Sequence, residues 1–343
     1  MKRKPKRKVT IRDVADLVDV HHSTVSRALS PTKRDQISTA MVEKVEKAAE
    51  KLGYYPSIVA SSLKQNRSFA IGVLIPDLMN PVFPPIIRGI QDAAEEFGYT
   101  VITANTDDEE VKERNALRMM QGRSIEGVII ATARRADPVV EECIDNDIPF
   151  VLVNRTVDRD GVNAVVIDED LGIRTVLDHM VGMKHTRIAH VAGPQDTSTG
   201  YHRAKAVSDY LRLHSLRSDL VETTDRFTIE EGRRAFKNLI ARDNNFTAVV
   251  AGNDLLALGC MDAMDEIGLL VPEDISICGY DDILFLERMN PALTTVLLPK
   301  YQMGAHATKI LLDIIGGESN GPGVLRMRPK LVIRNSTAVA QRD

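Results

Sequence analysis

The chain has 343 residues, of which 43% are hydrophobic and 27% are charged, a composition typical of globular proteins rather than fibrous or disordered ones. No apolar run approaches the roughly 20 residues that a spanning helix needs, and no apolar stretch follows the basic start, so we expect a cytoplasmic protein without a membrane segment. Cys143, Cys260 and Cys278 are odd in number and widely spaced. This pattern argues against a disulfide framework or a zinc cluster and predicts buried thiols.

The net charge of −4 conceals two segments of opposite sign. Residues 1–67 hold 15 Lys and Arg against 7 Asp and Glu, whereas the remaining residues hold 29 against 41. A basic head on an acidic body predicts a polyanion-binding module joined to a domain that does not bind polyanions. The run "MKRKPKRK" is equally well explained as a solvated tail.

A helix-turn-helix unit is predicted in the basic head. The first helix has apolar residues at i, i+3, i+4 and i+7 with Thr10 as its N-cap, and the second lies within residues 22–29 after a break of about three residues. A third helix, capped by Ser38 and ended by Gly53, supplies the common core. The apolar residues of the three stripes are Ile11, Val14, Ala15 and Val18, then Val25, Ala28 and Leu29, then Val42, Val45, Ala49 and Leu52.

The outer face of the second helix carries His22, Ser23, Ser26 and Arg27. A helix in the major groove of DNA needs short hydroxyl side chains at phosphates and longer donors at base edges, and this face supplies both. The alternative is a metal site at His21 and His22. Adjacent helical positions point about 100° apart and no third ligand is near in the sequence, so no metal is expected.

A very short helix is predicted within "YYPSIVASSLKQNRS", residues 54–68. It begins at Pro56 and Ser57, and Val59, Ala60 and Leu63 form its apolar side. A helix of two turns is marginal in water unless something packs on it. It is either a helical linker or a hinge that folds on DNA with Leu63 wedged in the minor groove.

After residue 68 continuous apolar runs alternate with amphipathic helices such as 86–97 and 114–123. Runs buried on both faces and joined by helices indicate doubly wound α/β layers with parallel sheets. Ligands of such sheets bind at the carboxyl ends of the strands. The expected strands are 69–75, 100–105, 127–131, 149–154, 164–168, 187–193, 248–253 and 275–281, and the polar residues at their ends are Asp77, Asn154, Arg155, Asp168, Asn253 and Asp281.

Four signatures in order resemble the lactose repressor/galactose repressor (LacI/GalR) family of bacterial transcription regulators. They are "TIRDVADLVDVHHSTVSRAL", "ISTAMVEKVEKAAEKLGYYPSIVASSL", "IGVLIPDLMNPVFPPIIRGIQDAAEEFGY" and "AVVAGNDLLALGCMDAMDEIGLLVPEDISICGYDD". The resemblance covers nearly the whole chain. It implies a helix-turn-helix domain (1–53), a hinge (54–67), and an effector-binding and dimerisation domain (68–343) similar to the type I periplasmic sugar-binding proteins. That domain's first subdomain would take about 68–165 and 297–328, and its second about 166–296 and 329–343.

By the same resemblance His22, Ser23 and Arg27 would read bases, and Thr24 and Ser26 would lie at phosphates. Ala60 and Leu63 would enter the minor groove at the centre of a palindromic operator bound by a homodimer. His21 stands where the family usually has serine, and Ser57 where it usually has asparagine. Histidine is a poorer cap than serine, which leaves the start of the second helix open.

The resemblance aligns Phe83, Asn154, Arg203, Phe227, Asn253 and Asp281 with effector-contacting positions, to which Asp77 and Arg155 are added from the strand ends. A polyol needs a carboxylate, an amide, a guanidinium and an aromatic face. Two arginines in one cleft would also suit a carboxylate, so a sugar and a sugar acid both remain open.

Two other function classes are weighed against a repressor controlled by a small effector. A nucleotide-binding enzyme is disfavoured because the sequence lacks G-x-G-x-x-G after the first strand, G-x-x-x-x-G-K-[ST], H-E-x-x-H and G-x-S-x-G. A solute-binding protein would share the body but not the basic head. We therefore expect no catalysis and no cofactor.

Overall fold

The computed structural model describes residues 9–29, 34–54, 67–319 and 321–341. The chain divides into two compact units, residues 1–68 and 69–343. The hinge residues Ala60 and Leu63, with the whole of the predicted hinge helix, lie outside the described residues.

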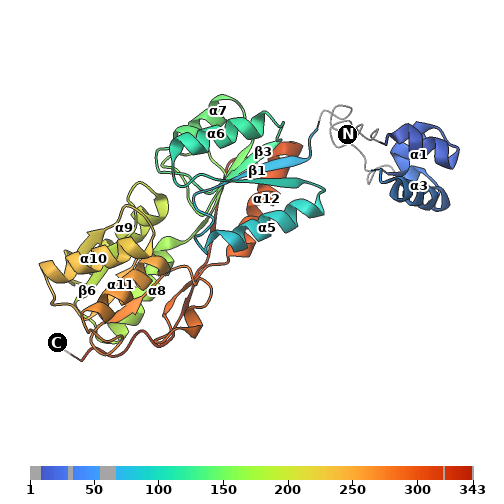
Figure 1. Ribbon diagram of the computed structural model, residues 1–343. Helices are drawn as coiled ribbons and strands as arrows, with labels where there is room; N and C mark the ends of the chain where they lie inside the picture. Colours follow the sequence, from blue (N-terminus) through green and yellow to red (C-terminus); the bar gives the residue numbers. More distant parts are fainter. Residues whose placement is uncertain (1–8, 30–33, 55–66, 320, 342–343) are drawn as a thin grey trace, which may run out of the picture. The chain divides into compact units, whose positions relative to one another are not determined.

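The first unit is a small helical domain drawn in blue in Figure 1. Its helices are α1 (Ile11–Val18), α2 (His22–Ala28), the 3-10 turn η1 (Arg34–Gln36) and α3 (Thr39–Leu52). Thr10 and Asp13 form a reciprocal capping box at the start of α1, and Gly53 ends α3 in the left-handed conformation that glycine favours. The predicted stripes share one core of Val14, Ala15, Val18, Val25, Ala28, Val42, Val45, Ala48 and Ala49.

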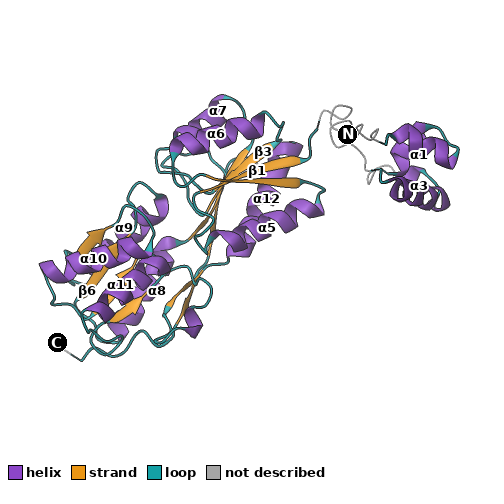
Figure 2. Cartoon of the chain, in the orientation of Figure 1, coloured by secondary structure: helices purple, strands orange, loops and turns teal. Residues whose placement is uncertain are grey.

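The second unit contains two parallel sheets with helices on their faces (Figure 2). We call the sheet with strand order β11-β5-β4-β3-β1-β2 and its helices the first subdomain. The strands are β1 (Ala70–Ile75), β2 (Thr100–Asn105), β3 (Gly127–Ile130), β4 (Phe150–Val153), β5 (Ala164–Ile167) and β11 (Val324–Met327), and the helices are α5 (Phe83–Glu96), α6 (Glu110–Gln121), α7 (Pro138–Asp145) and α12 (Lys300–Gly316).

The second subdomain is built on a sheet with strand order β7-β6-β8-β9. Its strands are β6 (Ile188–Ala192), β7 (Val221–Thr223), β8 (Ala248–Ala251) and β9 (Ser276–Cys278), and its helices are α8 (Glu169–Gly182), α9 (Ser198–Leu213), α10 (Ile229–Arg242) and α11 (Asp254–Glu266). A short 3-10 turn η2 (Leu286–Arg288) precedes the antiparallel pair β10 (Thr295–Leu297) and β12 (Lys330–Val332).

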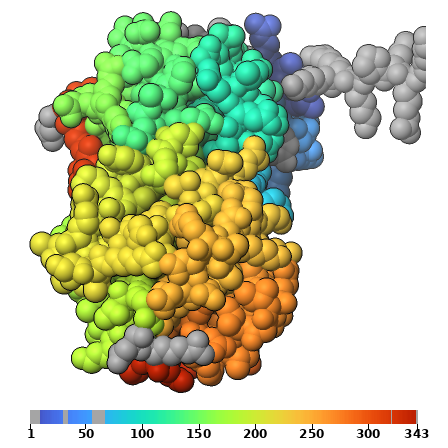
Figure 3. Space-filling model, turned by 90° about the vertical axis from the view of Figure 1, so that its left-hand side faces the viewer, coloured from blue at the N-terminus to red at the C-terminus, as the bar shows by residue number. Residues whose placement is uncertain are grey.

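The chain passes between the subdomains after β5, after β10 and after β11. On the face shown in Figure 3, green surface of the first subdomain meets yellow-green surface of the second. The backbone N–H of Arg135 donates to the carbonyl of Asp196 at 2.8 Å, and that of Thr156 to the hydroxyl of Ser198 at 2.9 Å. Segments of the first subdomain on both sides of β4 are therefore hydrogen-bonded to the N-terminal end of α9 in the second subdomain.

The eight strands expected from apolar runs are all present with boundaries shifted by at most three residues, and the expected doubly wound parallel architecture is confirmed. The three cysteines are buried thiols, and burial raises their pKa values. No described helix is long and apolar enough to cross a membrane.

Candidate functional site

The outer face of α2 is the candidate DNA-binding surface. Val25 and Ala28 are buried in the domain core, whereas His22, Ser26 and Arg27 are exposed. The other two predicted contact residues, Ser23 and Thr24, lie half-buried on the same helix. All five residues thus belong to one helix that presents hydroxyls, an imidazole and a guanidinium to solvent. That chemistry suits phosphates and base edges.

His21 begins α2 despite its weaker capping chemistry. Its backbone is extended, and its Nδ1 accepts from the backbone N–H of Ser23 at 3.3 Å. The Ser23 hydroxyl lies 2.8 Å from the same nitrogen. The ring of His21 is 4.0 Å from that of His22, centroid to centroid. Within the described ranges no group of three metal-ligating side chains occurs, and the contacts of His21 are those of a helix cap.

A small polar cavity in the second unit is the candidate effector site. It is lined from both subdomains, and seven of the eight residues predicted for the effector line it. Asp77 does not: its carboxylate accepts from the backbone N–H of Met79 at 2.8 Å in the turn after β1. The lining residues are Asn80, Val82, Phe83, Asn154, Arg155, Thr199, Arg203, Phe227, Asn253 and Asp281, around a volume of about 20 Å³.

Arg203 is the most heavily engaged side chain of this cavity. It projects from α9 with only 3% of its surface exposed. Its Nε and Nη2 donate to the two carboxylate oxygens of Glu169 at 2.9 and 3.1 Å, and its Nη1 donates to the carbonyl of Gly252 at 2.8 Å. Nη1 also lies 3.4 Å from Asp281 Oδ1, and the guanidinium carbon is 3.9 Å from the centroid of the Tyr280 ring. Burial opposes its charge, but the Glu169 and Asp281 carboxylates raise the pKa of Arg203 above its ordinary value.

Arg155 is the second buried cation of the cavity. Its Nη1 donates to Asp108 Oδ1 at 2.9 Å and to the carbonyl of Thr132 at 3.3 Å. The preceding residue, Asn154, directly follows β4 with a φ of 67°, a left-handed conformation that asparagine tolerates better than most residues. This bend turns the chain so that consecutive residues, 154 and 155, both line the cavity.

Asp281 belongs to a buried acidic pair at the carboxyl end of β9. Burial raises the pKa values of both Asp281 and Asp254, and the repulsion between the two carboxylates adds to the shift of Asp254. Asp254 accepts from the hydroxyl of Thr295 at 2.5 Å and from the N–H of Ile283 at 2.9 Å. The ammonium group of Lys300 donates to the backbone carbonyl of Asp281. Asp281 is therefore held in place by its surroundings rather than free in a turn.

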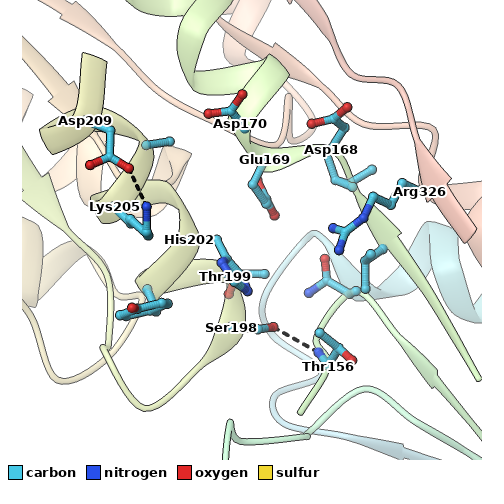
Figure 4. Close-up of a pocket in the computed structure, with 15 residues that line it drawn as sticks. Thr156, Asp168, Glu169, Asp170, Ser198, Thr199, His202, Lys205, Asp209 and Arg326 are labelled. Carbon is cyan, nitrogen blue, oxygen red and sulfur yellow. Dashed lines mark hydrogen bonds and ion pairs between the residues drawn. The ribbon is translucent and has the colours of Figure 1, made fainter. Parts of the chain in front are cut away.

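A larger cavity of about 480 Å³ shares Asn154 and Thr199 with the first. Figure 4 shows its labelled side chains, with Asp168, Glu169 and Asp170 at the start of α8 and the dashed ion pair of Lys205 with Asp209 on α9. Asp168 caps α8 by accepting from the N–H of Leu171 at 3.1 Å. The lining residues are Asn154, Thr156, Val166, Ile167, Asp168, Glu169, Asp170, Ser198, Thr199, Tyr201, His202, Lys205, Ala206, Asp209 and Arg326.

Three polar residues of the small cavity or its wall were missed from the sequence. Thr199 lies in the first turn of α9, after the predicted strand that corresponds to β6. The rule that ligands bind at the carboxyl ends of parallel strands could therefore have predicted it. Asn80 lies five residues after β1, and Glu169 directly follows Asp168, which the same rule had singled out. The pairing of Glu169 with Arg203, 34 positions away, had no local signal.

Comparison with known proteins identifies both units. The model described as bacterial regulatory proteins, lacI family, matches residues 10–57, and that of a periplasmic binding protein-like domain matches residues 177–337. The ribose operon repressor of Halalkalibacterium halodurans is 33% identical over 328 residues, covering 96% of this chain and 97% of that protein.

Two solved structures agree with these matches. The lac repressor dimer bound to operator and the anti-inducer ONPF has a TM-score of 0.86 at 27% identity, covering 97% of this chain and 100% of that one. The transcriptional regulator CelR in complex with cellobiose has a TM-score of 0.74 at 29% identity, covering 96% and 100%. With its helix-turn-helix head and two-subdomain body, this chain belongs to the lacI family of bacterial regulatory proteins.

Proposed function

We propose that the protein is a homodimeric repressor that binds a palindromic operator and is controlled by a small polyol or related metabolite in the cavity around Arg203 and Asp281. The observation that carries the proposal is that one chain joins the exposed polar face of α2 to a buried cavity lined from two subdomains. Family relatives with the same two parts include a ribose operon repressor and a cellobiose-bound regulator.

In this proposal each subunit places α2 in the major groove of one half-site. Arg27, His22 and Ser23 contact base edges, and the hydroxyls of Thr24 and Ser26 supply phosphate contacts. Ala60 and Leu63 would enter the minor groove between the half-sites, a role that rests on the sequence resemblance.

The effector acts by changing how the two subdomains close on each other, because a cavity of about 20 Å³ holds roughly one water molecule and has to open to admit a polyol. Asn154 and Arg155 come from the first subdomain, and Arg203 and Asn253 from the second, so a ligand that bonds to both sets stabilises one arrangement. Coupling between ligand and operator of about 1–3 kcal/mol is typical of such systems and changes operator affinity by about 5- to 150-fold.

The test begins with selection of genomic fragments by the full-length protein, followed by binding measurements on the enriched site. Arg27→Ala is expected to weaken binding by about 1–3 kcal/mol and to relax specificity at one position of each half-site. Lys51→Ala is the matched control, because Lys51 is an exposed cation in the last turn of α3. No enrichment of any site, or equal effects of the two variants, would contradict the proposal.

The effector half of the proposal is tested by a thermal-shift screen of sugars, sugar acids and nucleobases. A ligand of the folded state raises the melting temperature. The same ligand is expected to change operator affinity in the wild type and to leave the Arg203→Ala variant unresponsive while that variant still binds the operator. A ligand response retained by Arg203→Ala would show that the effector site lies elsewhere.

A further inference from the structure

The guanidinium of Arg203 has two edges that can grip a carboxylate with parallel N–H groups, and neither is free. The Nε–Nη2 edge is occupied by both oxygens of Glu169, at 2.9 and 3.1 Å. On the other edge Nη1 donates to the carbonyl of Gly252 at 2.8 Å and approaches Asp281 at 3.4 Å. Of the five N–H donors of an arginine, these hydrogen bonds use three; the second donor on Nη1 faces Asp281, and the second on Nη2 remains for a ligand. A single donor suits a hydroxyl, whereas a carboxylate prefers a two-point grip.

The Glu169–Arg203 pair also stands between the two cavities. Glu169 lines the larger cavity and Arg203 the smaller, and the side chains of both are almost completely buried, at 8% and 3% exposed. A ligand in the smaller cavity therefore lies against a guanidinium whose charge is already balanced by Glu169 on the side of the larger cavity. It also faces the carboxylate of Asp281, which lines the same cavity.

The other buried cation follows the same pattern. Arg155 is paired with Asp108 at 2.9 Å, so each arginine of the cavity has a carboxylate of the protein within hydrogen-bond distance. Counting Asp281, three carboxylates surround two guanidinium groups, and buried Lys300 and Asp254 next to Asp281 add one basic and one acidic group. An anionic ligand would add a like charge at short range in a site shielded from water, which is unfavourable, whereas a neutral polyol adds none.

We propose that Glu169 is a specificity-determining residue that excludes anionic effectors by occupying the carboxylate-binding edge of Arg203, so that the cavity accepts neutral polyols such as aldoses. This inference rests on the proposed effector function of the cavity and narrows it, because the two arginines alone are equally suited to a sugar acid.

The experiment compares matched ligands that differ in one carboxylate: D-ribose with D-ribonate, and D-glucose with D-gluconate. Isothermal titration of the full-length wild type is expected to show binding of an aldose that is about tenfold or more tighter than that of its aldonate, since charge-assisted bidentate bonds are denied to the acid. Equal or tighter binding of the aldonate overturns the proposal.

The Glu169→Gln variant provides a gain of function. It keeps an acceptor for Arg203 but removes the charge, and we expect aldonate affinity to rise by about tenfold or more relative to wild type. Asp170→Asn is the matched control: Asp170 is the next residue on α8, is exposed, and pairs with Arg174 rather than Arg203. Its aldonate affinity is expected to stay at the wild-type value.

Circular dichroism and melting temperature verify that each variant is folded, and Glu169→Asn is the second variant should Glu169→Gln unfold. A folded variant at position 169 without any gain in aldonate binding, or an equal gain in Asp170→Asn, overturns the proposal. Operator binding is measured on the same samples. A wild-type protein that binds no operator would count against the proposed regulatory function. A wild-type protein that binds the operator but does not prefer the aldose to the aldonate would count against the role of Glu169 alone.

Discussion

The guanidinium carbon of Arg135 lies 3.5 Å from the ring centroid of Tyr201, which places a cation directly over an aromatic face. Arg135 belongs to the loop between β3 and α7, and Tyr201 to the first turns of α9, so the contact joins the two subdomains. The Arg135 backbone N–H donates to Asp196, and its side chain pairs with Asp158 at 2.6 Å. The same segment therefore makes a cation–π contact and a backbone hydrogen bond across the boundary whose closure the effector would control.

Arg135→Ala is expected to loosen this boundary. Cation–π contacts contribute about 0.5–2 kcal/mol depending on exposure, and the backbone bond to Asp196 survives the substitution. We expect amide exchange of residues 195–201 to accelerate by about 2- to 30-fold in the absence of effector. Hydrogen exchange followed by mass spectrometry measures this. Arg174→Ala, which removes an exposed helix-surface pair with Asp170, is the control and should leave that segment unchanged. Equal exchange in Arg135→Ala and wild type would show that the contact contributes nothing.

Gly193→Ala is expected to weaken effector binding, although Gly193 does not itself line the small cavity. A Cβ at Gly193 would lie 2.2 Å from a ring carbon of Phe227, whose side chain lines the small cavity. The ring has to move, and overpacking of this kind costs about 1–3 kcal/mol. Effector affinity should therefore fall by about 5- to 150-fold, while operator affinity of the ligand-free protein stays near wild type.

Gly182→Ala is the matched control for that substitution, because a Cβ there meets nothing within 4 Å. It lies in the last turn of α8, where alanine is as good as or better than glycine. Isothermal titration with whichever ligand the thermal-shift screen identifies, together with mobility shifts on the selected operator, gives both affinities. Unchanged ligand binding in Gly193→Ala would mean that the Phe227 ring does not shape the site.

The raised pKa of Glu113 predicts how the free energy of unfolding changes with pH. Burial, reinforced by the nearby Asp137, raises the pKa of Glu113 to about 7, although the Thr132 hydroxyl donates to it. The folded state therefore binds this proton more tightly than the unfolded state, whose carboxyl titrates at the ordinary value of 4.5. The resulting stabilisation is complete below about pH 4.5 and is lost as the pH rises through about 7, a change on the order of 3 kcal/mol.

Glu113→Gln removes that titration because the amide stays neutral. We expect the difference in unfolding free energy, variant minus wild type, to grow more positive from pH 5 to pH 8, as measured by urea unfolding followed by circular dichroism. Comparing the two proteins cancels other titrations, such as that of buried His190, whose pKa burial lowers to about 4 and which therefore acts in the opposite direction. A difference that does not vary with pH would mean that Glu113 is not protonated in the folded protein near neutrality.

Local pattern was sufficient for most of the elements and for the strand-end residues Asn154, Arg155, Asn253 and Asp281 of the candidate site, whereas Phe83, Arg203 and Phe227 came from the family resemblance. Apolar runs located the central strands because these are buried on both faces, and the helix stripes located the helix-turn-helix unit because its three helices share one core. The four strands without an expectation, β7, β10, β11 and β12, are three or four residues long, and β11 is mostly exposed. Such segments need no continuous apolar run, so composition carries no signal for them.

By itself the sequence determined the division into a basic head and an acidic body, the alternation of strands and helices, and which polar residues follow the strands, because each depends on neighbours within a few positions. Tertiary structure alone decided what those residues do. It brought Glu169 onto Arg203, because the carboxyl ends of β5 and β8 and the start of α9 meet only after the sheets have formed. Asp77, by contrast, is held by a hydrogen bond from Met79, two residues away in its own loop. The charge left for a ligand is set by the long-range pairing of Glu169 with Arg203, which no local spacing encodes.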